Sequence, residues 1–184
     1  MLFDFSQELA DVAIVAIILF SFLKYHKKIK NAGLNINPIS LKQAILTIII
    51  VILVDLFFIW TTKPVEIANK FSTIKQLILS PIWEETLYRG AFLGIMPIVF
   101  KKVFDIKEKT KLFYFSFILV FIVQLLAFYI GHGGAAIVMI NGLLYSVLFL
   151  YPNKNLFRSI IAHFSGNFLI ILILELDLLS KITA

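Results

Sequence analysis

Six long apolar stretches constrain what this chain can fold into. They cover residues 9–23, 41–60, 74–100, 112–130, 135–151 and 156–179. Hydrophobic residues occupy 60% of the 184 positions, whereas charged residues occupy 15%. A water-soluble domain of this size has too little interior to bury so much apolar surface, so the hydrocarbon of a lipid bilayer must be its main solvent. We therefore expect an integral, multi-pass protein of the cell membrane.

The apolar stretches favour helices over strands. Strands of a membrane barrel alternate between lipid-facing apolar residues and polar residues, and these stretches do not alternate. A helix also satisfies its own backbone hydrogen bonds within the bilayer. Because a crossing helix needs roughly 17 to 25 residues, the stretches 9–23 and 135–151 are short for a full crossing. We expect an all-α, polytopic transmembrane helical bundle of about six helices, folded as a single integral membrane domain over residues 1–184.

The formal net charge of +6 comes mainly from lysines between the apolar stretches. Two clusters lie within residues 24–30 and 101–111, and Lys154 with Arg158 marks a third basic loop. Basic residues beside membrane spans are typical of cytoplasmic loops and suit anionic lipid headgroups. The sequence therefore predicts the lipid bilayer as a partner, and it predicts no nucleic-acid binding.

Three charged residues lie within six positions inside the stretch 74–100, although each costs about 2.5 to 3.5 kcal/mol at the centre of a membrane helix. Glu85 and Arg89 are one helical turn apart in the acid-before-base order that favours pairing, which by itself is more often structural. Glu84 lies about 100° around the helix and is left as the carboxylate suited to proton transfer. Asp55, in the stretch 41–60, is expected to reach the membrane interface or to cap a neighbouring helix.

Two of the three histidines also fall in apolar sequence. His132 ends the fourth stretch beside three glycines, and His163 begins the last stretch one helical turn before Asn167. His163 and Asn167 therefore share a helix face, where two donors can hold an oxyanion, although each residue alone is also a common interhelical contact. With basic loops in the cytoplasm, Glu84 and His132 belong to the outer half of the membrane and His163 enters from the inner side. The three either meet near mid-depth, or one short stretch does not cross.

Three motifs follow one another along these stretches: Glu84-Glu85 with Arg89, Phe128 with His132, and His163 with Asn167. In this order they resemble the CAAX-processing and bacteriocin-processing family of membrane peptidases, called CPBP or Abi and related to the Rce1 prenyl-protein endopeptidase. The motifs span residues 80–167, within a motif-bearing core of about 74–179. The chain is short for a member of this family.

The resemblance implies an intramembrane glutamic endopeptidase that acts on a peptide or protein substrate without a metal or other cofactor. It assigns catalysis to Glu84, His132, His163 and Asn167, with Glu85 and Arg89 in support. The first two would activate a water that attacks the peptide carbonyl, and the next two would stabilise the oxyanion. A more direct role for Glu85 stays open.

Two further readings use the same residues. In the first, Glu84, His132 and His163 are the ligands of a catalytic zinc ion in a zinc-dependent membrane protease, although the sequence has no His-Glu-x-x-His helix. Alternatively, the chain is a non-enzymatic bacteriocin-immunity or peptide-binding protein. A transporter is less favoured because the sequence has no internal repeat. The absence of cysteine excludes a cysteine nucleophile. The sequence alone assigns neither a particular substrate nor an oligomeric state.

Overall fold

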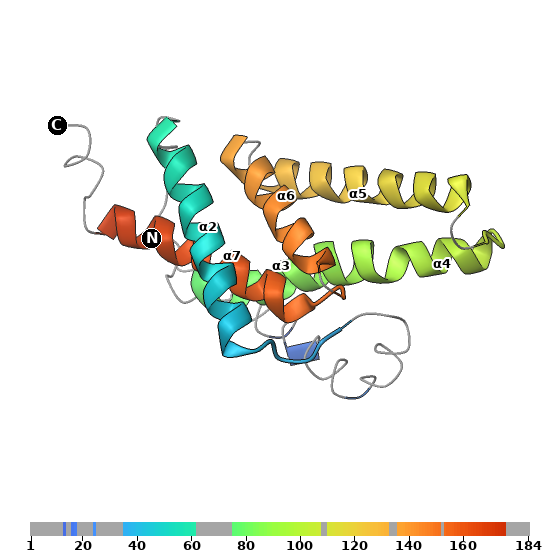
Figure 1. The fold of residues 1–184 in the computed structure, drawn as a ribbon, viewed down its shortest axis with the longest axis horizontal. Coiled ribbons are helices and arrows are strands. Elements are labelled where there is room, and N and C mark those ends of the chain that lie inside the picture. The colour runs from blue at the N-terminus through green and yellow to red at the C-terminus, as the bar shows by residue number, and fades with distance from the viewer. Residues whose placement is uncertain are drawn as a thin grey trace.

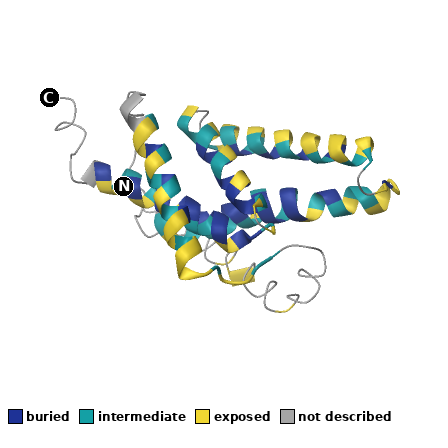
Figure 2. Cartoon of the chain, in the orientation of Figure 1, coloured by how far each residue is buried: buried dark blue, intermediate teal, exposed yellow. Residues whose placement is uncertain are grey.

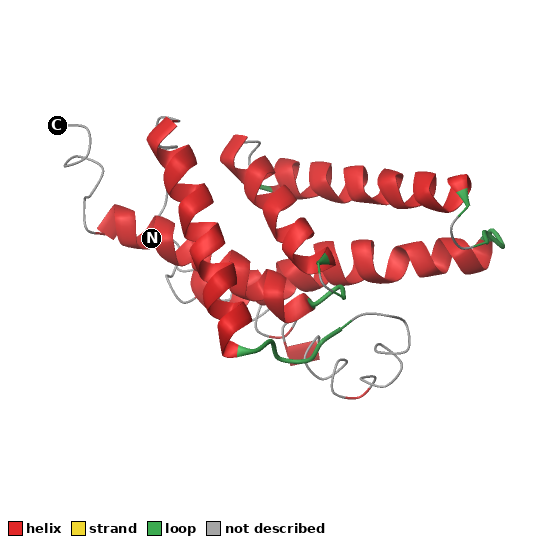
Figure 3. Cartoon of the chain, viewed as in Figure 1, coloured by secondary structure: helices red, strands yellow, loops and turns green. Residues whose placement is uncertain are grey.

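The computed structural model describes residues 13, 16, 17, 24, 35–61, 75–107, 110–132, 136–151 and 153–175. The expected helix at 9–23 therefore lies almost entirely outside the described residues. Within them the fold is helical, and the nearest approach to a sheet is an isolated bridge between Asn35 and Asn155 (Figure 3). The expectation of an all-α fold is confirmed.

Five helical segments make up the described fold (Figure 1). They are α2 (Leu41–Thr61); a rod of η1 (Lys75–Leu79), α3 (Ser80–Glu85), η2 (Thr86–Ile95) and α4 (Met96–Val103); α5 (Lys111–Gly131); α6 (Ala136–Leu150); and α7 (Leu156–Glu175). Helices α2, α5 and α7 are long and apolar enough to span a membrane, whereas α6 has 15 residues and is shorter than a full span. These segments match the last five expected helices.

The rod that replaces the expected helix at 74–100 alternates between α-helical and π-helical turns. The π-helical η1 comes just before Pro81, and the π-helical η2 comes just before Pro97. Proline lacks an N–H group and its ring collides with the carbonyl four residues earlier, so a locally wider turn accommodates it. The Glu84-Glu85 pair lies in the α-helical turn between these two wide segments.

Helix α5 exposes large apolar side chains and buries two polar ones. Its buried positions recur every fourth residue: Ser116, Val120, Gln124 and Phe128. Between its two end residues, the exposed positions are large and apolar, and they include Phe115, Ile118, Leu119, Ile122, Val123, Leu126 and Ile130 (Figure 2). Inside, the Ser146 hydroxyl donates to Gln124 Oε1 at 3.1 Å. An apolar exterior over polar interior contacts is suited to lipid and reverses the pattern of a soluble helix.

Helix α7 is the centre of the packing, because it contacts α2, α6 and the rod. The buried residues gather where these segments meet (Figure 2). One apolar cluster contains Leu93, Val120, Phe149 and Leu156, and a second contains Val51, Phe128, Tyr145, Leu148 and Ala162. This packing holds α3 and α7 against each other, so their polar residues can meet.

Arg158 corrects one expectation from the sequence, because it does not lie in a basic loop. It lies in the first turn of α7 and is 7% exposed. Its Nε donates to the Thr47 hydroxyl of α2 at 3.1 Å, and its Nη1 donates to the Tyr151 carbonyl at 2.8 Å. Arg158 therefore ties the start of α7 to α2.

Candidate active site

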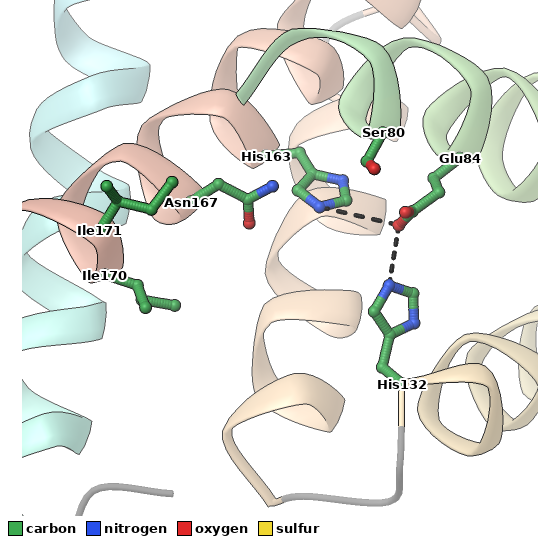
Figure 4. A pocket seen from close by; sticks show the side chains of 7 residues that line it. All are labelled: Ser80, Glu84, His132, His163, Asn167, Ile170 and Ile171. Atoms are coloured by element: carbon green, nitrogen blue, oxygen red, sulfur yellow. Dashed lines mark hydrogen bonds and ion pairs between the residues drawn. The ribbon is translucent and has the colours of Figure 1, made fainter. Parts of the chain in front are cut away.

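One pocket of about 220 Å³ brings together residues from α3, α7 and the end of α5 (Figure 4). It is lined by Ser80, Glu84, His132, His163, Asn167, Ile170 and Ile171. The sequence placed Glu84 and His163 in opposite halves of the membrane unless they met near its middle, and here they share one pocket. The expected meeting of these side chains is found, and their catalytic roles stay predictions.

A proton must lie between Glu84 and His132. The Phe128 carbonyl can only accept, so His132 Nδ1, which lies 2.7 Å from it, carries a hydrogen. The other ring nitrogen, Nε2, lies 2.8 Å from Glu84 Oε2. A neutral imidazole with its hydrogen on Nδ1 and an ionised carboxylate would face each other here with lone pairs only. The pair is therefore either imidazolium with carboxylate or imidazole with carboxylic acid, and it is neutral overall in both forms.

His163 is held by the second glutamate. Its Nδ1 lies 2.9 Å from Glu85 Oε1, and Arg89 Nη1 donates to the same oxygen at 3.0 Å. Because a guanidinium can only donate, Glu85 Oε1 is the acceptor for Arg89, and it also accepts a hydrogen from His163 Nδ1. The free Nε2 faces the pocket, 3.7 Å from Glu84 Oε2. Glu84 Oε2 therefore faces the Nε2 atoms of both histidines.

Arg89 joins three elements beneath the pocket and has no exposed surface. Besides its pair with Glu85, which the sequence predicted, its Nη2 donates to the Gly142 carbonyl of α6 at 2.8 Å. Its guanidinium carbon lies 4.4 Å from the centre of the Phe128 ring of α5, within cation–π range. Arg89 thus links α3, α5 and α6, and it holds Glu85 where this residue contacts His163.

Aromatic rings hold both imidazoles in place. The Tyr145 ring of α6 stacks on His163 with centroids 5.0 Å apart and planes 23° apart. Phe128 meets His163 edge-on at 6.0 Å and lies 4.2 Å from the His132 ring. Phe128 therefore positions His132 through two contacts, one from its ring and one from its backbone carbonyl.

Because Gly142 has no side chain, α6 lies close to Phe128 and Leu125 of α5. A Cβ at this position would lie 2.8 Å from Phe128 Cδ1 and 3.1 Å from Leu125 Cδ1, and the Phe128 ring is 2% exposed with no room to withdraw. We expect Gly142→Ala to lower the free energy of unfolding by about 1 to 3 kcal/mol. Gly90→Ala is the control: its Cβ would have nothing nearer than 3.8 Å, so we expect unchanged or higher stability. Denaturant titration in detergent micelles measures both, and equal stabilities would contradict the packing described here.

Asp55 corrects another expectation, because it neither reaches the interface nor caps a helix. It has no exposed surface and lies in the second half of α2, facing α6 and α7. Sequence reasoning also missed Ser80, Ile170 and Ile171 as pocket residues. Helical spacing carried a signal for two of them, since Ser80 comes one turn before Glu84 and Ile171 comes one turn after Asn167.

Among the described residues, no cluster of three or more His, Asp or Glu side chains is arranged to hold a metal ion. The expectation that the site works without a cofactor stays a prediction, which a chelator tests.

Glutamate and histidine side chains gathered inside an apolar helical bundle are typical of membrane proteins with a functional site between their helices. The family "Type II CAAX prenyl endopeptidase Rce1-like" has a sequence model that matches residues 66–169, more than half of the chain. The chain belongs to this family, so it is a CAAX-type intramembrane protease, and its three candidate spans agree with a multi-pass membrane protein. The search of curated proteins and the search of solved structures each gave no match.

Proposed function

We propose that this protein hydrolyses a peptide bond with a water activated by Glu84 and His132, while His163 and Asn167 bind the oxyanion. The observation that carries the proposal is the position of Glu84 Oε2, 2.8 Å from His132 Nε2 and 3.7 Å from His163 Nε2. A carboxylate that lies between two imidazoles and lines a pocket can accept a proton from water and return it to the leaving group. The proposed hydrogen-bond donors to the oxyanion line the same pocket.

The first step forms a bond between the water oxygen and the peptide carbonyl carbon. Glu84, as the carboxylate of its pair with imidazolium His132, takes the water proton, and the carbonyl electrons move to oxygen. In the second step the C–N bond breaks, and the amine leaves with the proton held by Glu84. The products are a free carboxyl end and a free amino end, and the pair regains its starting protons. No atom of the enzyme forms a covalent bond to the substrate.

The oxyanion role requires a particular protonation state of His163. Because Nδ1 donates to Glu85, a neutral His163 has no hydrogen on Nε2 and cannot donate into the pocket. His163 therefore acts as an imidazolium, with Glu85 as its hydrogen-bonded carboxylate. The Asn167 side chain, one turn further along α7, lines the same pocket and supplies a neutral donor.

The substrate we propose is an extended peptide segment at the membrane. The pocket wall beyond Asn167 is formed by Ile170 and Ile171, which suit an apolar side chain next to the cleaved bond. The family's name points to prenylated CAAX tails as one such substrate. A farnesylated CAAX peptide and its matched unprenylated peptide would separate recognition of the lipid from recognition of the peptide.

The test uses the full-length protein in liposomes, incubated with these two peptides and with a peptide library made from a whole proteome. We expect new peptide ends, detected by mass spectrometry, with the wild-type protein and none with Glu84→Gln. A wild-type protein that produces no new ends from any of the three would refute the proposal.

A chelator separates this scheme from the zinc alternative. We expect cleavage in the presence of EDTA or 1,10-phenanthroline at the untreated rate, since Glu84 and His132 activate the nucleophile without a metal ion. Activity that is lost on chelation and restored by Zn²⁺ would instead assign Glu84, His132 and His163 as metal ligands. No contact among the described residues specifically favours a non-enzymatic immunity role.

A further inference from the structure

Asp55 is a buried carboxylate for which the proposed reaction has no use. It comes from α2, outside the residues matched by the family, and packs against the helix that carries His163. A Cβ on Gly166 of α7 would lie 3.0 Å from Asp55 Oδ2 and would overlap the Tyr145 hydroxyl. Asp55 and the outer end of the Tyr145 ring therefore meet beside α7, and the same ring stacks on His163.

Asp55 gains little from its surroundings as a structural residue. Among the described residues, the Asn141 side chain interacts with it as a donor, but neither Asp55 oxygen has a well-formed hydrogen bond, and Asn141 Oδ1 also lacks one. A buried carboxylate without such bonds is costly, and inside membrane helices such groups are typical of functional sites. The titratable group of α7 within electrostatic range of Asp55 is His163.

With His163 as the proposed imidazolium, the charges around the pocket balance only when Asp55 is ionised. The described titratable groups around His163 and its partners are Glu84 and Glu85 of α3, Tyr88 and Arg89 of η2, His132 after α5, Tyr145 of α6, and Asp55 of α2. The Glu84–His132 pair is neutral, and Glu85 balances Arg89. An imidazolium at His163 then leaves one positive charge without a partner, and an ionised Asp55 cancels it.

We propose that Asp55 is a positioning residue that supplies the counter-charge for the imidazolium form of His163. It does not touch the substrate. It acts across the Tyr145 ring and keeps a proton on His163 Nε2, where the oxyanion needs a donor. This inference rests on the proposed function and extends it, because it assigns to α2 a part in the reaction.

The main test measures kcat, KM and pH dependence for Asp55→Asn with the best peptide from the library. We expect kcat at neutral pH to fall about 10- to 100-fold, with KM changed by less than about twofold. Lower pH should restore part of the lost activity, because a higher proton concentration protonates His163 without its counter-charge. A purely structural role would lower activity at every pH, in proportion to the loss of folded protein.

Matched variants separate charge from packing. Asp55→Glu and Asp55→Gln are equal in size and differ in charge, so we expect only Asp55→Glu to keep the wild-type pH dependence. Thr47→Val is the control. It changes another fully buried polar residue of α2, which accepts a hydrogen bond from Arg158, and it should leave kcat unchanged. Wild-type kcat and pH dependence in Asp55→Asn, or identical behaviour of the Glu and Gln variants, would overturn the inference.

A second measurement does not depend on activity. Diethyl pyrocarbonate modifies only an unprotonated imidazole nitrogen, so its rate at His163, read by mass spectrometry, reports the neutral fraction. We expect faster modification of His163 at neutral pH in Asp55→Asn than in the wild-type protein, and equal rates would refute the counter-charge. If Glu84→Gln cleaves peptides normally, the proposed function fails, and the labelling still shows whether Asp55 favours the protonated form of His163.

Discussion

Glu84→Gln is expected to lower kcat by about 10²- to 10⁴-fold and to leave the protein folded. Glutamine has the size of glutamate and can still hydrogen-bond to His132 Nε2, so the pocket keeps its shape. It cannot accept the water proton, so the attacking oxygen stays weakly nucleophilic. Initial rates on the best library peptide, at saturating concentration, measure the effect.

Thr86→Val is the matched control for this variant. Thr86 lies two residues after Glu84 on the same rod, and its hydroxyl donates only to the Ile82 carbonyl of its own helix, at 2.7 Å. We expect wild-type kcat and a thermal midpoint close to that of the wild-type protein. If Glu84→Gln keeps substantial activity while both variants remain folded, Glu84 is not the base and the proposed mechanism is wrong.

The features that the sequence predicted are those set within one helix. Apolar runs gave the positions of five described helices, because lipid requires each span to be apolar over a fixed length. The Glu85–Arg89 pair and the shared face of His163 and Asn167 follow from the spacing of one helical turn. These relations do not depend on which helices are neighbours.

The features that the sequence did not predict depend on contacts between helices. The burial of Asp55 arises because α2 packs on α7 where Gly166 has no side chain, and no local pattern in α2 signals this. The hydrogen bond of Glu85 to His163 likewise joins residues 78 positions apart. It gives Glu85 two partners, where the sequence predicted only Arg89.

Arg89→Met is expected to lower the free energy of unfolding by about 3 to 5 kcal/mol, the typical cost of removing one partner from a buried ion pair. Methionine fills much of the volume of arginine but leaves Glu85 without its guanidinium and the Gly142 carbonyl without its donor. The Phe128 ring also loses its cation–π contact. Denaturant titration in detergent micelles measures the change.

Two further variants show whether charge or packing causes this loss. Lys102→Met removes an exposed cation from the same rod, and its effect should stay within about 0.5 kcal/mol. Adding Glu85→Gln to Arg89→Met removes the carboxylate left behind, so the double variant should be more stable than Arg89→Met alone. The alternative outcome is additive: the double variant loses as much free energy of unfolding as Arg89→Met and Glu85→Gln lose together. That result would show that the loss comes from packing and not from the unpaired charge of Glu85. If the double variant is more stable than Arg89→Met, the main role of Arg89 is to pair with Glu85, whose Oε1 also accepts the hydrogen of His163 Nδ1 and so directs Nε2 into the pocket.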